Sequence, residues 1–222
     1  MKSKKQRIKF IFERGILQKD FYIKNTRLST RKLVKLFPVS SPFIVVSVFQ
    51  NRLSFLKAIH KKEVPSWLVA YVPPKSTSGI CILSNKKEPI AKKVMGQVLL
   101  HELAHIYTNA LNPNLPDWLK EGVSVYIARQ IFKPSIFTAD WKKIAPENIP
   151  FRRVSWKFAA EHNGYGIAGL LVMFSVRRYG WKKFIAAISH NHSTRFSAKS
   201  IPLYFGERFE SFITEFKKQF VN

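Results

Sequence analysis

The sequence is poor in cysteine and in acidic residues. Cys81 is the single cysteine among 222 residues, which excludes a disulfide framework and a thiolate metal cluster. Any metal site must therefore use histidine and carboxylate ligands. Acids number 13 against 38 Lys and Arg, for a net charge of +25. Such an excess favours association with nucleic acid or with an anionic membrane surface. Because the charge is scattered along the chain, an ordinary solvated basic surface is the alternative.

Long hydrophobic runs are also missing. The basic segment 1–17 contains apolar residues, but Lys9, Glu13 and Arg14 interrupt them, so no continuous signal-peptide core is evident. The longest apolar run downstream, residues 166–176, is well short of the ~20 residues that span a bilayer. We therefore expect a cytoplasmic protein with no transmembrane segment.

The two parts of the chain differ in hydrophobic pattern. Short apolar and β-branched runs predict strands at 7–12, 42–49, 67–72 and 79–84, with one helix at about 51–62. Residues 73–79, "PPKSTSG", predict a turn, so the last two strands are expected to form a hairpin. Beyond residue 88, helices are expected at about 89–111, 116–132, 154–179 and 207–220.

This order of elements predicts the fold class and the domain organisation. Strands followed by helices indicate an α+β fold with segregated layers. We expect a small mixed or antiparallel sheet in residues 1–88 and a mainly helical half in residues 89–222. Together they are predicted to form a single domain, residues 1–222.

The segment "HELAH" (101–105) carries the first candidate functional residues. His101 and His105 are four residues apart on a predicted helix, so both imidazoles can reach a common point. Two nitrogen ligands of one zinc ion require this geometry. Glu102 lies about 100° round the helix, where it can act as a base for bound water without ligating. The alternative is two surface or capping histidines on an ordinary core helix.

A second segment, "PDWLKEG" (116–122), adds a carboxylate. Pro116 and Asp117 begin a helix on which Glu121 shares a face with apolar residues. A buried carboxylate needs a cation or strong donors, and a metal ion would provide the cation. Gly122 is predicted to let this helix approach the HELAH helix closely. Two histidines and one glutamate, with water in the fourth position, form the ligand set of a catalytic zinc site.

These two segments resemble a known family. "HELAH" followed by "PDWLKEGVSVYIA" is similar to the gluzincin metallopeptidases, which share the thermolysin-like zincin fold. "WLKEG" is similar to the WLxEG segment of zinc aminopeptidases and of peptidase MA-like domains. Residues 94–131 carry the clear match. The resemblance implies a zincin-like fold and a zinc metallopeptidase with one Zn²⁺ per chain, held by His101, His105 and Glu121, with Glu102 as general base.

Departures from the family pattern refine the expected activity. Val125 stands where the thermolysin branch has an acid, so the groups that orient the ligands must come from elsewhere. The segment 79–84, taken as the edge strand, lacks the glutamate with which aminopeptidases hold a free amine. The expected activity is therefore endopeptidase-like hydrolysis of a peptide or protein substrate.

The oxyanion formed during hydrolysis needs a hydrogen-bond donor. The segment "EHNGYGIAGLLVMFSVRRYG" (161–180) resembles the helix that follows the third ligand in these families, which makes Tyr165 the candidate donor. The alternative role for Tyr165 is packing or helix capping. His162 is a lesser candidate.

A function of a different class is also compatible with the sequence. The chain could be a basic nucleic-acid-binding protein that keeps a structural or vestigial metal site. Its charge permits this function, but the sequence contains no recognised nucleic-acid-binding motif.

Overall fold

The computed structural model describes residues 7–84, 91–130, 164–190 and 199–220. The chain divides into two compact units, Met1–Pro113 and Asn114–Asn222. The fold is mixed α+β, as predicted, with a small sheet and several helices. The single domain expected from the sequence stays a prediction.

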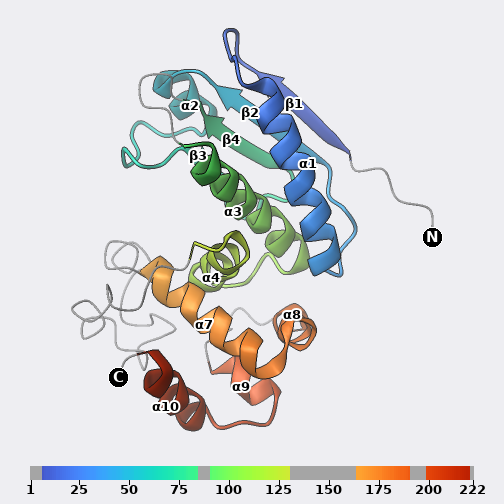
Figure 1. The fold of residues 1–222 in the computed structure, drawn as a ribbon, viewed down its shortest axis with the longest axis vertical. Coiled ribbons are helices and arrows are strands. Elements are labelled where there is room, and N and C mark those ends of the chain that lie inside the picture. Colours follow the sequence, from blue (N-terminus) through green and yellow to red (C-terminus); the bar gives the residue numbers. More distant parts are fainter. Residues whose placement is uncertain (1–6, 85–90, 131–163, 191–198, 221–222) are drawn as a thin grey trace. The chain divides into compact units, whose positions relative to one another are not determined.

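The first unit is built on a four-stranded mixed sheet (Figure 1). Its strands are β1 (Ile8–Phe12), β2 (Ile44–Phe49), β3 (Ala70–Tyr71) and β4 (Gly79–Leu83), in the order β1-β2-β4-β3. The pairs β1–β2 and β2–β4 are parallel, whereas β3 runs antiparallel to β4. All four predicted strands are present, and the predicted hairpin around residues 73–79 is confirmed.

The edge of this sheet is not the strand that the sequence suggested. β4 pairs on both sides, with Cys81 opposite Ser47 of β2 and opposite Tyr71 of β3. The prediction that residues 79–84 form the edge strand is therefore wrong, and β3 forms that edge. Inter-strand pairing is non-local, so the apolar pattern of a strand does not reveal which neighbours it has.

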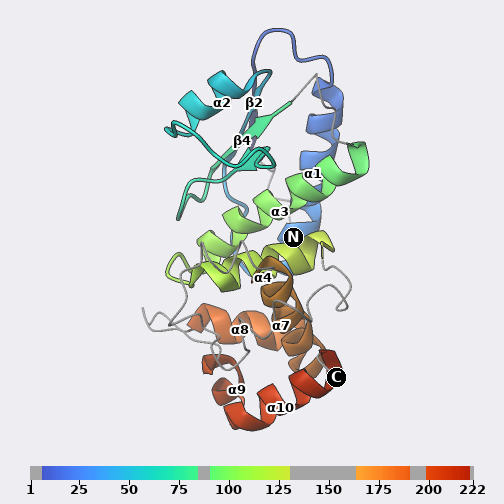
Figure 2. The same cartoon turned by 90° about the vertical axis from the view of Figure 1, so that its left-hand side faces the viewer.

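Helices cover both faces of the sheet. Figure 2 shows α2 (Arg52–Ala58) on one side of β2 and β4, and α1 (Lys19–Leu36) and α3 (Lys92–Leu111) on the other. The predicted α2 is confirmed with shorter bounds, whereas α1 was not predicted. Because α1 lies between β1 and β2 in the chain, strands and helices alternate here. The segregated order expected from the sequence does not hold in this unit.

The second unit is helical within its described residues. Its helices are α4 (Asp117–Ala128), α7 (Gly164–Tyr179), α8 (Trp181–His190), α9 (Ser200–Tyr204) and α10 (Phe209–Phe220). The ring of Phe174 on α7 packs edge-on against Phe212 and Phe216 of α10, with centroids 4.9 and 5.5 Å away. The helices predicted at 116–132, 154–179 and 207–220 are found, except that residues 131–132 and 154–163 lie outside the described part of the chain.

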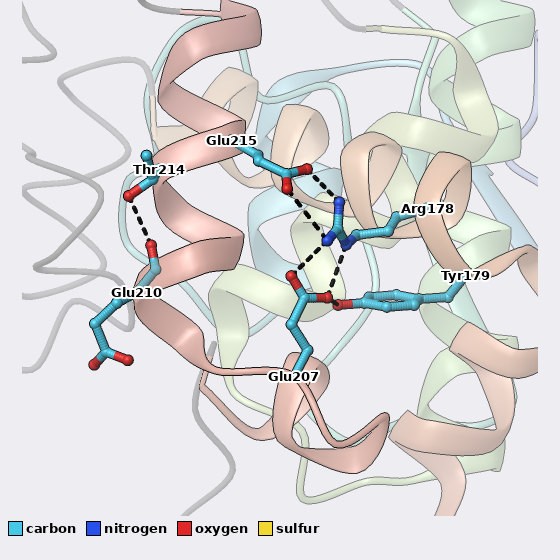
Figure 3. Close-up of polar contacts among 6 residues, drawn as sticks. All are labelled: Arg178, Tyr179, Glu207, Glu210, Thr214 and Glu215. Atoms are coloured by element: carbon cyan, nitrogen blue, oxygen red, sulfur yellow. Dashed lines mark hydrogen bonds and ion pairs between the residues drawn. The ribbon is translucent and has the colours of Figure 1, made fainter.

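A polar cluster joins the end of α7 to α10 and the residues that precede it (Figure 3). The Arg178 guanidinium donates to both oxygens of Glu207, at 2.7 and 2.8 Å, and also to Glu215. The Tyr179 hydroxyl donates to Glu207 as well. Burial and the bond to Glu207 raise the pKa of Tyr179. This cluster fixes the C-terminal elements to α7.

No helix in the described ranges is both long enough and apolar enough to cross a bilayer.

Candidate metal centre

The HELAH segment lies in the second half of α3. The helix runs for 20 residues, and Leu99, Leu103 and Ile106 are fully buried at helical spacing. Val94, near the start of the helix, is 46% exposed and does not belong to this buried face. His101, Glu102 and His105 are each half-buried. The motif therefore occupies the boundary between the core face and the outer face of α3.

The two histidines converge, as the sequence predicts. Their Nε2 atoms are 3.1 Å apart, and the ring centroids are separated by 4.8 Å with the planes at 71°. Two nitrogens bound at ~2.0–2.1 Å to one tetrahedral zinc ion lie about 3.3–3.4 Å apart. The observed spacing therefore fits two ligands of a single ion with a small adjustment. A hydrogen bond between the two rings is the other arrangement that this distance allows.

Glu102 lies on the side of α3 that borders the edge strand. The pKa of Tyr71 in β3 is raised first by burial, then by the negative charge of Glu102, and then by Cys81. An electrostatic effect of this kind requires the Glu102 carboxylate to be in the neighbourhood of Tyr71. The sequence did not identify Tyr71 as a site neighbour, because which strand forms the edge is not a local property.

A hydrogen bond connects α3, the helix with the two candidate histidine ligands, to the β3–β4 turn. Asn109, one helical turn after His105, donates from Nδ2 to the carbonyl oxygen of Ser76 at 2.9 Å. The Ser76 hydroxyl in turn accepts from the backbone N–H groups of Ser78 and Gly79. This contact holds α3 at a fixed place relative to the hairpin. The sequence prediction did not include Asn109, although its i+4 spacing from His105 places the two residues on the same side of the helix.

Glu121 lies on α4, in the second unit. It is half-buried, and the apolar residues around it on the helix, Trp118 and Val125, are 3% and 4% exposed. This agrees with the predicted apolar face. Val125 offers no charged or polar group one turn beyond Glu121, so within α4 nothing replaces the acid of the thermolysin branch at that position.

Gly122, next to Glu121, permits a close helix approach. A Cβ built on Gly122 would stand 2.5 Å from the carbonyl oxygen of Ala168 and 3.0 Å from the Val172 side chain, both on α7. The sequence predicted a close approach for this glycine, but to the HELAH helix. The approach found in the structure is to α7. The backbone beside Glu121 is thereby fixed within the second unit.

Tyr165 is the second residue of α7 and is half-buried. Gly164 and Gly166 on either side of it are buried, which fits the small-residue turn noted in the sequence. His162 lies outside the described residues. Tyr126 of α4 stacks on Trp181, with ring centroids 5.9 Å apart, so its ring contributes to packing within the second unit. The roles assigned to Tyr165 and Glu121 stay predictions.

His60 is a further histidine of the first unit. It is exposed and has a left-handed backbone with φ of 54°.

Comparison with protein-family models, with curated proteins and with solved structures finds no match to this chain, so its function has to be argued from the residues described above.

Proposed function

We propose that this protein is a zinc-dependent metallopeptidase with endopeptidase-like activity. The observation that carries the proposal is the 3.1 Å separation of the His101 and His105 Nε2 atoms on one helix. In the proposal Glu121 of the second unit supplies the third ligand, as the resemblance of segments 101–105 and 116–122 to the gluzincins implies. Two histidines and one carboxylate are the protein ligands of many catalytic zinc sites.

In this proposal each residue of the chain has one task. His101, His105 and Glu121 hold the ion, which supplies Lewis acidity and lowers the pKa of water when it is bound. Glu102 takes a proton from the attacking water and later delivers it to the leaving amine. Tyr165 donates a hydrogen bond to the oxyanion that forms on the scissile carbonyl.

The metal is the first part of the proposal to test. Protein purified without chelators should contain about one zinc per chain by mass spectrometry of the metal content, and His105→Ala should lose it. His60→Asn is the matched control, because it removes an exposed imidazole and asparagine tolerates the left-handed backbone there. Wild-type protein without zinc would refute the proposal, as would an equal loss in both variants.

A second experiment separates metal binding from chemistry. Glu102→Gln should retain zinc while abolishing cleavage of a peptide library, because the amide cannot accept the proton from water. The exposed Glu63→Gln is the control for the loss of one carboxylate. Substrates with acetylated N-termini should still be cleaved, since endopeptidase-like action requires no free amine. Wild-type activity in the Glu102 variant would exclude Glu102 as the base.

A further inference from the structure

The outward side of α1 gathers basic residues around one exposed leucine. The inner side packs with Tyr22, Thr26 and Leu33 buried, and α1 lies beside α3, where a Cβ built on Gly96 would stand 3.5 Å from Asn25 Oδ1. At 100° per residue, the opposite side is centred on positions 24, 28, 31 and 35. This side carries Lys24, Arg27, Leu28, Arg31 and Lys35, all of which are exposed. We call these five residues the α1 basic face.

The charges of this face are not balanced by neighbours. Within the described ranges, Lys24, Arg27, Arg31 and Lys35 form no ion pair. Asp20, in the first turn, is the single acid of α1. The four cations follow one another at intervals of three or four residues, which corresponds to about 5–6 Å along the axis. A row of positive charge roughly 16 Å long is therefore presented to the solvent.

The apolar residues on this side distinguish between two classes of anionic partner. Leu28 is 50% exposed and lies one turn from both Lys24 and Arg31. Val34, at the margin of the face, is 39% exposed. A nucleic-acid backbone offers phosphates but no apolar counterpart for a leucine among them. The interface of an anionic membrane offers both, because phosphate and carboxylate groups lie directly above acyl chains.

We propose that the α1 basic face is a docking surface for an anionic lipid membrane. Lys24, Arg27, Arg31 and Lys35 contact lipid headgroups, while Leu28 enters the boundary between headgroups and acyl chains. The attachment is peripheral and reversible, since a single leucine and four cations give far less binding than an inserted helix. This attachment would place the proposed hydrolase close to substrates at a membrane. The attachment itself does not depend on which metal the candidate centre binds.

The test is partitioning of the full-length protein onto vesicles. Phosphatidylcholine vesicles with about 30% phosphatidylserine should bind the protein, and pure phosphatidylcholine vesicles should not. Each basic residue near an anionic leaflet contributes about a fivefold change in partitioning, so Arg27→Gln/Arg31→Gln/Lys35→Gln together should weaken binding about 100-fold. High salt should have the same effect, because the Debye length falls to about 3 Å at 1 M.

Two controls make the result specific to this face. Lys57→Gln/Lys61→Gln/Lys62→Gln removes three exposed charges elsewhere in the first unit and should change partitioning by less than about threefold, through net charge alone. Arg27→Lys/Arg31→Lys keeps the charge and should bind as wild type. All variants use good helix formers or exposed loop positions, and circular dichroism should show unchanged folding.

Leu28 decides between a membrane and nucleic acid. Leu28→Ala should weaken vesicle binding roughly tenfold, because three side-chain carbons are removed and about half of the leucine surface is exposed and available for burial in the membrane; it should leave binding to a 20-base-pair DNA duplex unchanged. The proposal is overturned if the α1 variant binds vesicles as well as wild type, or if both triple variants lose binding equally. Tighter, salt-sensitive binding to the duplex than to vesicles, with no effect of Leu28→Ala on either, would assign the face to nucleic acid instead.

Discussion

The close packing of α4 on α7 predicts a large effect from a single methyl group. In Gly122→Ala, the new Cβ would stand 2.5 Å from the oxygen and 2.8 Å from the carbon of the Ala168 carbonyl. These are backbone atoms, which cannot rotate away as a side chain can. The helices must separate by about 0.9 Å to reach the 3.4 Å at which ordinary contact begins. Overpacking of this kind costs about 1–3 kcal/mol.

The same substitution also has a favourable part, which a second glycine can measure. Alanine in place of glycine inside a helix stabilises by about 0.5–1 kcal/mol. Gly96→Ala on α3 isolates this gain, because its nearest neighbour, Asn25 Oδ1, would be 3.5 Å away in ordinary contact. We therefore expect Gly122→Ala to lose about 1–2 kcal/mol and Gly96→Ala to gain a few tenths or more.

Urea unfolding followed by circular dichroism would measure both free energies. Gly122→Ala should also lower zinc affinity, because a shift of α4 displaces the adjacent Glu121, whereas Gly96→Ala should not. If Gly122→Ala proves as stable as Gly96→Ala, the approach of α4 to Ala168 is not as close as described. If Gly122→Ala is destabilised but binds zinc as tightly as wild type, the packing of α4 on α7 does not control the proposed ligand Glu121.

Two further predictions concern the second unit. Tyr165→Phe should lower turnover ~10²–10³-fold while zinc content and stability stay near wild type, because only the hydroxyl donor is lost; unchanged turnover would exclude Tyr165 from the chemistry. Arg178→Gln should destabilise the fold by roughly 1 kcal/mol at pH 7. Burial raises the pKa of Glu207, but the bonds from Arg178 and Tyr179 outweigh it, and the net shift is downward from 4.5. A lowered folded pKa contributes stability above the unfolded value and loses it as pH falls, so the stabilities of wild type and variant in urea unfolding should converge as the pH falls below 4.5 and through the folded pKa of Glu207. A difference that stays constant would show that Glu207 is not the partner.

The strands were predictable because their signal is local. Residues 44–49 and 79–83 are apolar and β-branched, and the structure buries Val46, Val48 and Ile82 in the sheet. The turn residues between 73 and 79 likewise encode the hairpin by themselves. A pattern of this kind needs no knowledge of the remaining chain. The parallel pairing of β1, β2 and β4 does need it, because each pair joins strands that are separated by a helix.

α1 was missed for a different physical reason. Its buried positions include Thr26, Ser29 and Thr30, so a stripe of large apolar residues at helical spacing is absent. The Thr30 hydroxyl is satisfied locally by the Thr26 carbonyl, at 2.8 Å. Small polar residues can line a helix–helix contact when they bond within their own helix. A search for hydrophobic periodicity is insensitive to such a helix.

The candidate site divides in the same way into local and non-local parts. The convergence of His101 and His105 depends on one helix alone, and the prediction is confirmed. The contacts of Gly122 depend on which helix lies opposite, and the structure shows a close approach to α7 that the sequence did not predict. Asn109 and Tyr71 emerge only when the hairpin is placed beside α3. The sequence motif thus predicted the geometry within one helix better than the surroundings of that helix.

The position of β3 also changes the basis of the endopeptidase assignment. The endopeptidase prediction rests on the absence of an acid from residues 79–84, but β4 is an inner strand and its residues do not form the edge. The test has to be applied to β3 and its flanks, residues 67–72, where the sequence is "WLVAYV". This segment also lacks an acid, and Tyr71 is its one residue with a polar side-chain group besides the Trp67 indole. Residues 67–72 themselves therefore offer no carboxylate to a free α-amine, and the proposed preference for internal peptide bonds no longer depends on residues 79–84.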